Sequence, residues 1–314
     1  MESIAESKSL QLPADSPEQD RAYEFCREIT RKHAKSFYFS ARFLTKEKRR
    51  PIYALYALCR LVDDEVDGAE VSGETEAIKA VERWKAKLDE IYREKFPAQT
   101  QIPGTADKGQ AEVLRAWSDM LSRYRIRQEL PLELMRGVLM DTHVKRYETW
   151  EELYVYCFRV ASTVGLMSSE IFGYEKPETL EYAEALGIAM QLTNILRDIR
   201  QDALMERIYL PQEDLRKFNV TEEQIFAGIA DENFVELMKF EIERARHYYR
   251  LAEKGIALLE RDTRFTVLLA ARIYSRILNE IERQDYDVFS RRAHTSLKQK
   301  IASLPRIWLE ARKM

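Results

Sequence analysis

The sequence is poor in the residues that interrupt helices. Only ten of its 314 residues are Gly and nine are Pro, whereas 45% are apolar. An all-β fold of this length needs many more turn residues, so the composition favours an all-α protein with one large core. We therefore expect a single helical domain over residues 18–314, preceded by a polar, mobile leader at 1–17.

Three further scarcities exclude classes of function. The cysteines Cys26, Cys59 and Cys157 are odd in number and widely spaced, which favours a reducing compartment over disulfides or zinc. A net charge of −3 lacks the basic excess of a nucleic-acid-binding protein, so we expect no nucleic-acid partner. No apolar run approaches the ~18 residues that span a membrane, and the acidic N-terminus does not resemble a signal peptide. These features favour a cytoplasmic location.

Turn residues and caps predict where individual helices begin and break. Ser16 followed by Pro17 predicts a capped helix start, and a second start is expected at Thr45. The segment 97–109 is rich in Gln, Thr, Pro and Gly, which predicts a loop. Other breaks are expected at the following positions: Pro131, 173–177 and Pro211.

Two acidic clusters lie far apart in the sequence. In the first, D-D-E-V-D at 63–67, Asp63 and Asp67 are four residues apart; in the second, Asn194, Asp198 and Asp202 repeat that step twice. Residues four apart share one face of a helix, so each set lines a single face. Two anionic faces that converge need a cation between them. All five side chains are hard oxygen donors, which favours Mg²⁺ or Mn²⁺ and suits a diphosphate as a further ligand.

Both clusters are embedded in apolar sequence. Tyr56 and Arg60 extend the first face, and Gln191 extends the second, with Leu, Ile and Val between the polar positions. Burying unpartnered carboxylates costs several kcal/mol each, so they must be paired, metal-bound or in a wet cavity. A surface ion-pair patch would explain one D-x-x-x-D pattern, but two embedded patterns favour the metal site.

Several segments resemble the squalene and phytoene synthase family, and the resemblance spans residues 20–305. The segments are H-A-K-S-F-Y at 33–38, Y-A-L-Y-A-L-C-R at 53–60, Y-C-F-R-V-A-S-T-V-G at 156–165, Q-L-T-N-I-L-R-D at 191–198 and E-R-I-Y-L-P at 206–211. The tail D-Y-D-V-F-S-R-R-A at 285–293 is more similar to the phytoene branch than to the squalene branch. One departure is Gln201, which stands where many relatives carry an acidic residue and so alters the local charge.

The resemblance implies an isoprenoid synthase helical bundle around a central cavity. Members of this family join two prenyl diphosphates head to head through a cyclopropyl diphosphate, with Mg²⁺ assisting the departure of each diphosphate. Ionisation separates charge, so rate is gained where metals and arginines meet the leaving group. The implied metal ligands are Asp63, Asp67, Asn194, Asp198 and Asp202, and the implied catalytic residues are Asp63, Asp67, Asp198, Asp202, Arg60, Arg197, Tyr56 and Tyr274.

The same resemblance implies a set of substrate contacts. Aromatic faces stabilise carbocations by about 1–2 kcal/mol each, although core packing is the commoner role of any single tyrosine. No G-x-G-x-x-G motif follows an expected strand, so we expect no NADPH. The implied substrate-binding residues are His33, Lys35, Ser36, Phe37, Ala41, Arg60, Tyr156, Gln191, Arg197, Arg207 and Tyr209.

The length of the substrate is predicted from Ala41. If residues 33–41 form one helix, Ala41 shares a face with His33 and Phe37 and leaves room in the cavity wall. We therefore expect two C20 geranylgeranyl diphosphates and a C40 hydrocarbon, made without a reductant. The alternative is a dehydrosqualene or squalene synthase that uses two C15 farnesyl diphosphates, with Ala41 only packing between helices.

Other classes of all-α protein remain as alternatives. A head-to-tail prenyltransferase or terpene cyclase would also bind Mg²⁺, but a second D-D-x-x-D and an N-D-x-x-S-x-x-x-E motif are missing. A di-iron bundle would need paired E-x-x-H sequences, which do not occur. A non-catalytic scaffold derived from this fold would be expected to have lost its carboxylates. Release of diphosphate from a prenyl diphosphate with Mg²⁺ would distinguish these classes.

The C-terminal segment combines cations with apolar residues. Such a segment is most often a solvated helix, but it is also typical of a helix that lies on an anionic membrane. Because the expected product is an oil, we expect peripheral association with the inner face of the membrane. The cations are Arg291, Arg292, Lys298, Lys300, Arg306, Arg312 and Lys313.

Overall fold

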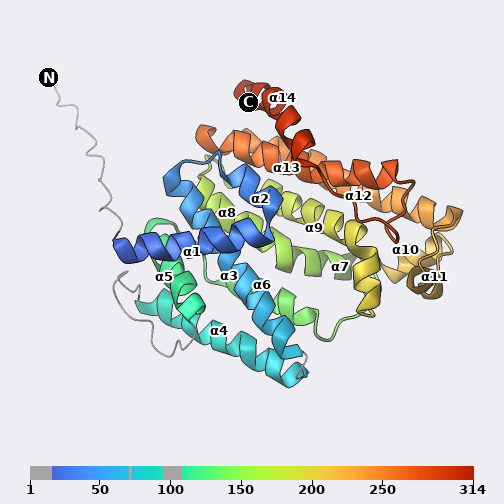
Figure 1. The fold of residues 1–314 in the computed structure, drawn as a ribbon, viewed down its shortest axis with the longest axis horizontal. Helices are drawn as coiled ribbons and strands as arrows, with labels where there is room; N and C mark the ends of the chain where they lie inside the picture. The colour runs from blue at the N-terminus through green and yellow to red at the C-terminus, as the bar shows by residue number, and fades with distance from the viewer. Residues whose placement is uncertain (1–15, 71–72, 95–107) are drawn as a thin grey trace.

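The computed structural model describes residues 16–70, 73–94 and 108–314 (Figure 1). Within these ranges the chain forms helices joined by short connections and no β-strand, so the all-α expectation is confirmed. The predicted leader at 1–17 lies outside the described residues except for Ser16 and Pro17. The predicted loop at 97–109 also lies outside them up to residue 107.

The helices follow one another in a simple order along the chain. Their bounds are α1 Pro17–His33, α2 Lys35–Ala41, α3 Lys46–Glu70, α4 Glu74–Glu94, α5 Lys108–Arg123, α6 Glu129–Met140, α7 Trp150–Cys157, the π-helical turn η1 Phe158–Ser162, α8 Thr163–Phe172, α9 Thr179–Leu204, α10 Gln212–Lys217, α11 Glu222–Ala227, α12 Glu232–Ile256, α13 Arg261–Arg283 and α14 Leu297–Lys313.

The predicted helix starts are confirmed. Ser16 caps α1 by accepting from the Gln19 N–H, and the Gln19 side chain accepts from the Ser16 N–H in return. The second predicted start is that of α3, which begins at Lys46, directly after Thr45. The predicted breaks also occur, at the starts of α6 and α10 and between α8 and α9. Lys108–Arg123 is helical, so the loop prediction was wrong at its last two residues, Lys108 and Gly109.

Residues 33–41 do not form one helix, so that assumption was wrong. Ala34 leaves the helical region with φ −130° and ψ 63°, ending α1 and starting α2. The two helices have different packing partners, because α1 packs against α3 and α5 whereas α2 packs against α13. The change of partner requires the chain to turn at Ala34. His33 therefore does not share a helical face with Phe37 and Ala41.

The helices form two halves that meet along α9. In Figure 1 the N-terminal helices α1 to α5 lie together on one side, and α10 to α12 lie on the other. The first half has an apolar core around Trp84 and Trp117, and the second has a core around Phe234 and Leu237. The long helix α9 packs against α8, α12 and α13. It therefore places its polar face between the two cores.

Helices α7 and α8 are continuous apart from η1, a π-helical turn that α9 approaches closely. A Cβ at Gly187 would lie 2.4 Å from the Ser162 Cα, and one at Gly165 would lie 2.7 Å from the Ala183 carbonyl oxygen. Both glycines thus permit close helix packing beside the cavity. Within the described residues no helix combines the length and apolarity needed to cross a membrane.

Candidate active site

A cavity of about 1090 Å³ lies between the two halves of the bundle. Its walls come from α2, α3, η1, α8, α9 and α13, and the start of α14 contributes Lys300. Two of the predicted site residues, Asp67 and Arg207, are not among the lining residues. Those that line it are His33, Lys35, Ser36, Phe37, Ala41, Tyr56, Arg60, Asp63, Tyr156, Gln191, Asn194, Arg197, Asp198, Asp202, Tyr209 and Tyr274.

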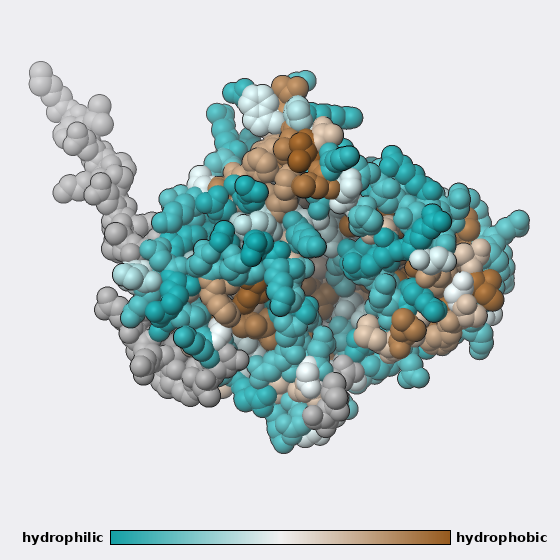
Figure 2. Space-filling view, in the orientation of Figure 1, coloured by the Kyte–Doolittle hydropathy of each residue, from teal (hydrophilic) through white to brown (hydrophobic). Residues whose placement is uncertain are grey.

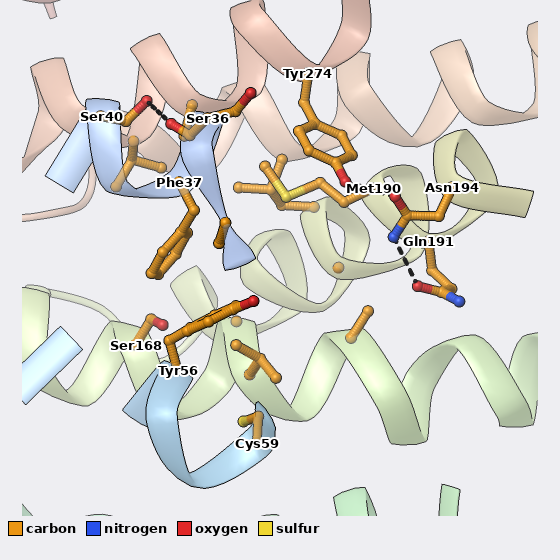
Figure 3. A pocket seen from close by; sticks show the side chains of 18 of the residues that line it. Ser36, Phe37, Ser40, Tyr56, Cys59, Ser168, Met190, Gln191, Asn194 and Tyr274 are labelled. Carbon is orange, nitrogen blue, oxygen red and sulfur yellow. Dashed lines mark hydrogen bonds between the residues drawn. The ribbon is translucent and has the colours of Figure 1, made fainter. Parts of the chain in front are cut away.

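The α3 wall carries the first acidic cluster. Tyr56 lies under Phe37 of α2, with ring centroids 5.7 Å apart, as Figure 3 shows. One turn further along α3, Arg60 Nη1 lies 3.1 Å from Asp63 Oδ2, and the same guanidinium also pairs with Asp64. Asp67 is exposed one turn beyond the cavity. Helical periodicity therefore brings an aromatic ring, a cation and a carboxylate into one wall.

The α9 wall carries the second cluster and is tied to α13. The Tyr274 hydroxyl donates to Asn194 Oδ1 at 2.5 Å, and Asn194 Nδ2 donates to Gln191 Oε1 at 3.1 Å (Figure 3). Arg197 donates through Nε to Asp198 Oδ1 at 2.9 Å. Hydrogen bonds within the protein thus hold four polar side chains of α9, those of Gln191, Asn194, Arg197 and Asp198.

The three carboxylates that line the cavity from α3 and α9 differ in charge compensation. Burial raises the pKa of Asp63 to about 6, with Asp67 adding repulsion and Arg60 opposing it. Burial and neighbouring Asp198 raise the pKa of Asp202 to about 7. For Asp198 burial acts in the same direction, but Arg197 and Arg292 outweigh it and lower the pKa overall. Neighbouring cations thus compensate the charge of Asp63 and Asp202 less fully than the charge of Asp198.

These residues fit a divalent metal that a substrate phosphate helps to hold. Within residues 16–70, 73–94 and 108–314, no three side chains of the His, Cys, Asp or Glu type converge closely enough to bind an ion alone. Mg²⁺ is usually held by one or two carboxylates together with substrate phosphates and water. The raised pKa values of Asp63 and Asp202 show anionic groups that a cation would relieve.

One carboxylate and two cations of the site were not predicted from the sequence. Asp141, after the end of α6, accepts from the Tyr156 and Tyr209 hydroxyls; it belongs to no i, i+4 acidic pattern that would have identified it. Arg292 Nε donates to Asp198 Oδ1 at 2.7 Å. Lys300 is 8% exposed and donates to Ser36 Oγ at 2.7 Å. Arg292 and Lys300 thus both line the cavity. Lys300 is buried, so the prediction that it lies on a membrane-facing surface was wrong, whereas 54% of the Arg292 side chain stays exposed.

An apolar cavity with carboxylates and arginines along two of its walls is typical of an enzyme that binds long apolar chains with polyanionic head groups. Comparisons with known proteins agree with this class. The sequence pattern of the squalene/phytoene synthase family matches residues 30–299. The chain therefore belongs to the squalene/phytoene synthase family and is a prenyltransferase.

Individual relatives cover almost the whole chain. A 15-cis-phytoene synthase of Synechocystis sp. is 40% identical over 97% of this chain and 91% of its own length. A phytoene synthase of Arthrospira platensis is 39% identical over 98% of both chains. Among solved structures, a ligand-bound dehydrosqualene synthase has a TM-score of 0.84 at 29% identity, covering 95% of this chain and 99% of its own. Enzymes of this family generally depend on Mg²⁺.

Proposed function

We propose that this chain is a phytoene synthase. It condenses two geranylgeranyl diphosphates head to head, through prephytoene diphosphate, to phytoene and releases diphosphate. The observation that carries this proposal is the near full-length similarity to cyanobacterial phytoene synthases, at about 40% identity, combined with a cavity lined by both acidic clusters. The second candidate is a C15-using enzyme, because a dehydrosqualene synthase has a closely similar fold.

The acidic clusters would hold Mg²⁺, and Mg²⁺ in turn neutralises the charge that develops on each departing diphosphate. The proposed ligands are Asp63, Asp67, Asn194, Asp198 and Asp202. Arg60 pairs with Asp63 and Arg197 pairs with Asp198, which supports a role for both guanidinium groups in binding diphosphate oxygens. The Tyr274 hydroxyl holds Asn194 in place.

The remaining walls protect the carbocations. Phe37 and Tyr56 present ring faces to the cavity, and a cation over such a face gains about 1–2 kcal/mol when water is excluded. Apolar side chains such as Val164 and Leu186 line the same cavity. Water therefore has few polar partners along these walls, which limits premature quenching of a cation.

One assay tests the reaction as a whole. Purified protein is incubated with Mg²⁺ and either the C20 or the C15 diphosphate, with and without NADPH, and the extracted hydrocarbon is identified. We expect phytoene from the C20 substrate and no effect of NADPH. A product formed only from the C15 substrate, or only with NADPH, would instead support the dehydrosqualene or squalene synthase alternative.

Ala41 is the proposed determinant of chain length. It is 2% exposed, lines the cavity and lies one helical turn after Phe37 on α2. A ring introduced into a packed wall costs about 1–3 kcal/mol to accommodate, so Ala41→Phe should shift the preference from the C20 to the C15 diphosphate. Ala41→Val is the graded control and should shift it less. An unchanged C20/C15 ratio in folded Ala41→Phe would contradict this role.

Peripheral association with the cytoplasmic face of an anionic membrane is also proposed, through α14. Leu297, Ile301 and Trp308 are exposed along one side of this helix, and Arg312 lies over the Trp308 ring at 4.3 Å. Figure 2 shows brown apolar side chains gathered near this end of the molecule. Apolar residues with nearby cations are typical of interfacial helices.

Flotation with anionic vesicles at low and high salt tests the membrane proposal. Binding should weaken at high salt, because charge attraction is screened. Lys298→Glu should weaken binding at low salt, and Ile301→Glu should weaken it at both salt concentrations. Absence of binding, or binding that salt does not change, would contradict the proposal.

A further inference from the structure

Asp141 lies behind the cavity wall at a point where three separate segments converge. It follows the last residue of α6. The Tyr209 hydroxyl donates to Oδ1 at 2.7 Å, and the Tyr156 hydroxyl donates to Oδ2 at 2.9 Å. Arg207 Nη2 donates to the Asp141 main-chain oxygen at 2.8 Å. Each carboxylate oxygen therefore has its own tyrosine donor.

The two tyrosines connect Asp141 to the cavity. Tyr156 and Tyr209 stack with centroids 5.2 Å apart and both line the cavity, whereas Asp141 is not among the lining residues of the described chain. Tyr147 packs against both rings, with centroids 5.5 and 6.0 Å away. The stack fixes the ring positions, and Asp141 is hydrogen-bonded to the cavity wall through Tyr156 and Tyr209, while burial and, in addition, the charge of Asp141 raise the pKa of Asp63 and Asp202.

The hydrogen bonds determine what the tyrosines present to the cavity. A tyrosine hydroxyl has one proton, and in Tyr156 and Tyr209 that proton is donated to Asp141. Burial and the charge of Asp141 raise the pKa of both tyrosines, so both hydroxyls keep their protons. Only the lone pairs of each oxygen remain for a ligand. A hydroxyl that donates to a carboxylate is also polarised, which makes its oxygen and ring more electron-rich.

We infer that Asp141 is a positioning residue that turns Tyr156 and Tyr209 into electron-rich acceptors facing the carbocations of the reaction. This inference rests on the proposed function. An electron-rich ring and a lone pair stabilise positive charge more than they stabilise a neutral polyprenyl chain. Asp141 should therefore affect turnover more than substrate binding.

Asp141→Asn tests the inference, because it keeps the size of the side chain but removes its charge and one of its two acceptors. We expect kcat to fall roughly 10- to 100-fold while KM and the Mg²⁺ concentration for half-maximal activity change less than about threefold. An unchanged kcat, or a loss confined to KM, would overturn the inference. A strongly raised Mg²⁺ requirement would do the same, because it would identify Asp141 as a metal ligand.

A double-mutant cycle tests whether Asp141 acts through the tyrosines. The cycle treats Tyr156→Phe with Tyr209→Phe as one change and Asp141→Asn as the other. If Asp141 acts through the tyrosines, the combined variant should lose much less kcat than the product of the losses from the two changes made separately. Multiplicative losses would show independent roles and would contradict the inference. Wild-type protein that is inactive with both prenyl diphosphates would overturn the proposed function and this inference together. An active wild type with normal Asp141→Asn turnover would overturn the inference alone.

Asp119 provides a matched control for loss of stability. It is also a buried carboxylate that accepts from a tyrosine hydroxyl, with Tyr23 Oη 2.7 Å away, but it lies between α1 and α5 and does not line the cavity. Asp119→Asn should lower the melting temperature and leave kcat per folded molecule unchanged. Similar losses of kcat in Asp119→Asn and Asp141→Asn would show a general packing effect and would overturn the inference.

Discussion

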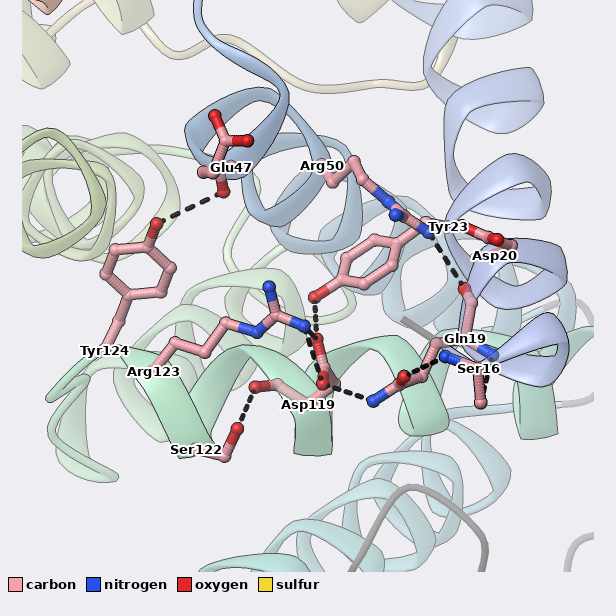
Figure 4. Close-up of polar contacts among 10 residues, drawn as sticks. All are labelled: Ser16, Gln19, Asp20, Tyr23, Glu47, Arg50, Asp119, Ser122, Arg123 and Tyr124. Atoms are coloured by element: carbon pink, nitrogen blue, oxygen red, sulfur yellow. Dashed lines mark hydrogen bonds and ion pairs between the residues drawn. The ribbon is translucent and has the colours of Figure 1, made fainter. Parts of the chain in front are cut away.

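The carboxylate packed between α1 and α5 and the carboxylates around the cavity are neutralised in different ways. Between α1 and α5, Asp119 is 5% exposed and accepts from Gln19 Nε2 at 2.6 Å and from the Tyr23 hydroxyl at 2.7 Å, with Arg123 Nη2 3.0 Å away (Figure 4). Its partners come from two helices of the same chain. Each carboxylate oxygen of Asp119 thus has a hydrogen-bond donor within the protein, and Asp119 stabilises the packing of α1 against α5.

The cavity carboxylates lack such complete compensation. The Asp63 side chain is 40% exposed and has Arg60 as an ion-pair partner, yet its pKa is raised to about 6 by burial and by Asp67. Asp202 has a pKa raised to about 7 by burial and by Asp198. Like charges held together in a cavity destabilise the fold unless a cation joins them. Asp119 is thus compensated within the protein, whereas Asp63 and Asp202 have the incomplete compensation that the proposed Mg²⁺ would relieve.

The largest expected effect is on turnover, which should depend on the proposed metal ligands and not on Asp119. Asp198→Asn and Asp67→Asn should each lower turnover by at least ~10²-fold, because each removes a charge from the group that stabilises the departing diphosphate. Asp119→Asn should leave turnover unchanged. Steady-state assays with saturating Mg²⁺, together with circular dichroism of each variant, measure both. Near-wild-type turnover in either Asp198→Asn or Asp67→Asn would contradict the metal assignment.

Substitution of Asp119 should lower the free energy of unfolding more than substitution of Asp198. Asp119→Ala leaves the buried donors of Tyr23, Gln19 and Arg123 without their shared acceptor, which should cost about 2 kcal/mol of unfolding free energy. Urea denaturation measures this loss. Asp198→Asn should lose less, since its carboxylate lies at the cavity wall with 19% of the side chain exposed. Equal losses in the two variants would remove the distinction between the regions.

The smallest expected effect concerns pH. The pKa of Asp202 is about 7 in the folded protein and near 4 in the unfolded chain. The protonated Asp202 carboxyl therefore stabilises the fold fully below about pH 4, and this stabilisation is lost as the pH rises through 7. Without divalent cations, Asp202→Asn should therefore be more stable than wild type by about 1 kcal/mol at pH 8, with the difference shrinking toward pH 4. Thermal unfolding in a chelator across this range measures it.

Addition of Mg²⁺ and inorganic diphosphate sharpens the same prediction. A ligand that binds only the folded state raises its stability by mass action, so wild type should gain more than Asp202→Asn. The two melting temperatures at pH 8 should then converge or change order. An equal gain in both proteins would show that Asp202 does not contribute to cation binding.

The parts of the site that follow from helical periodicity could be predicted from the sequence. The spacing of Tyr56, Arg60 and Asp63 is enough to place them on one face of α3, and Asn194 and Asp198 are related in the same way on α9. These five residues line the cavity, whereas Asp67, the last position of the predicted face of α3, lies one turn beyond it. The capped start at Ser16 is equally local, because its hydrogen bonds join residues three apart. Local geometry needs no knowledge of the rest of the fold.

Tertiary structure decided which distant groups complete the site. Asp141 meets Tyr209 across 68 positions of the sequence, and Arg292 meets Asp198 across 94. No periodic pattern links residues so far apart, because their contact depends on how α6, α9 and the segment after α13 pack. The turn at Ala34 has the same origin, since α1 and α2 pack against different helices. The sequence by itself determined which side chains share a helix face, whereas packing of the helices determined which faces meet.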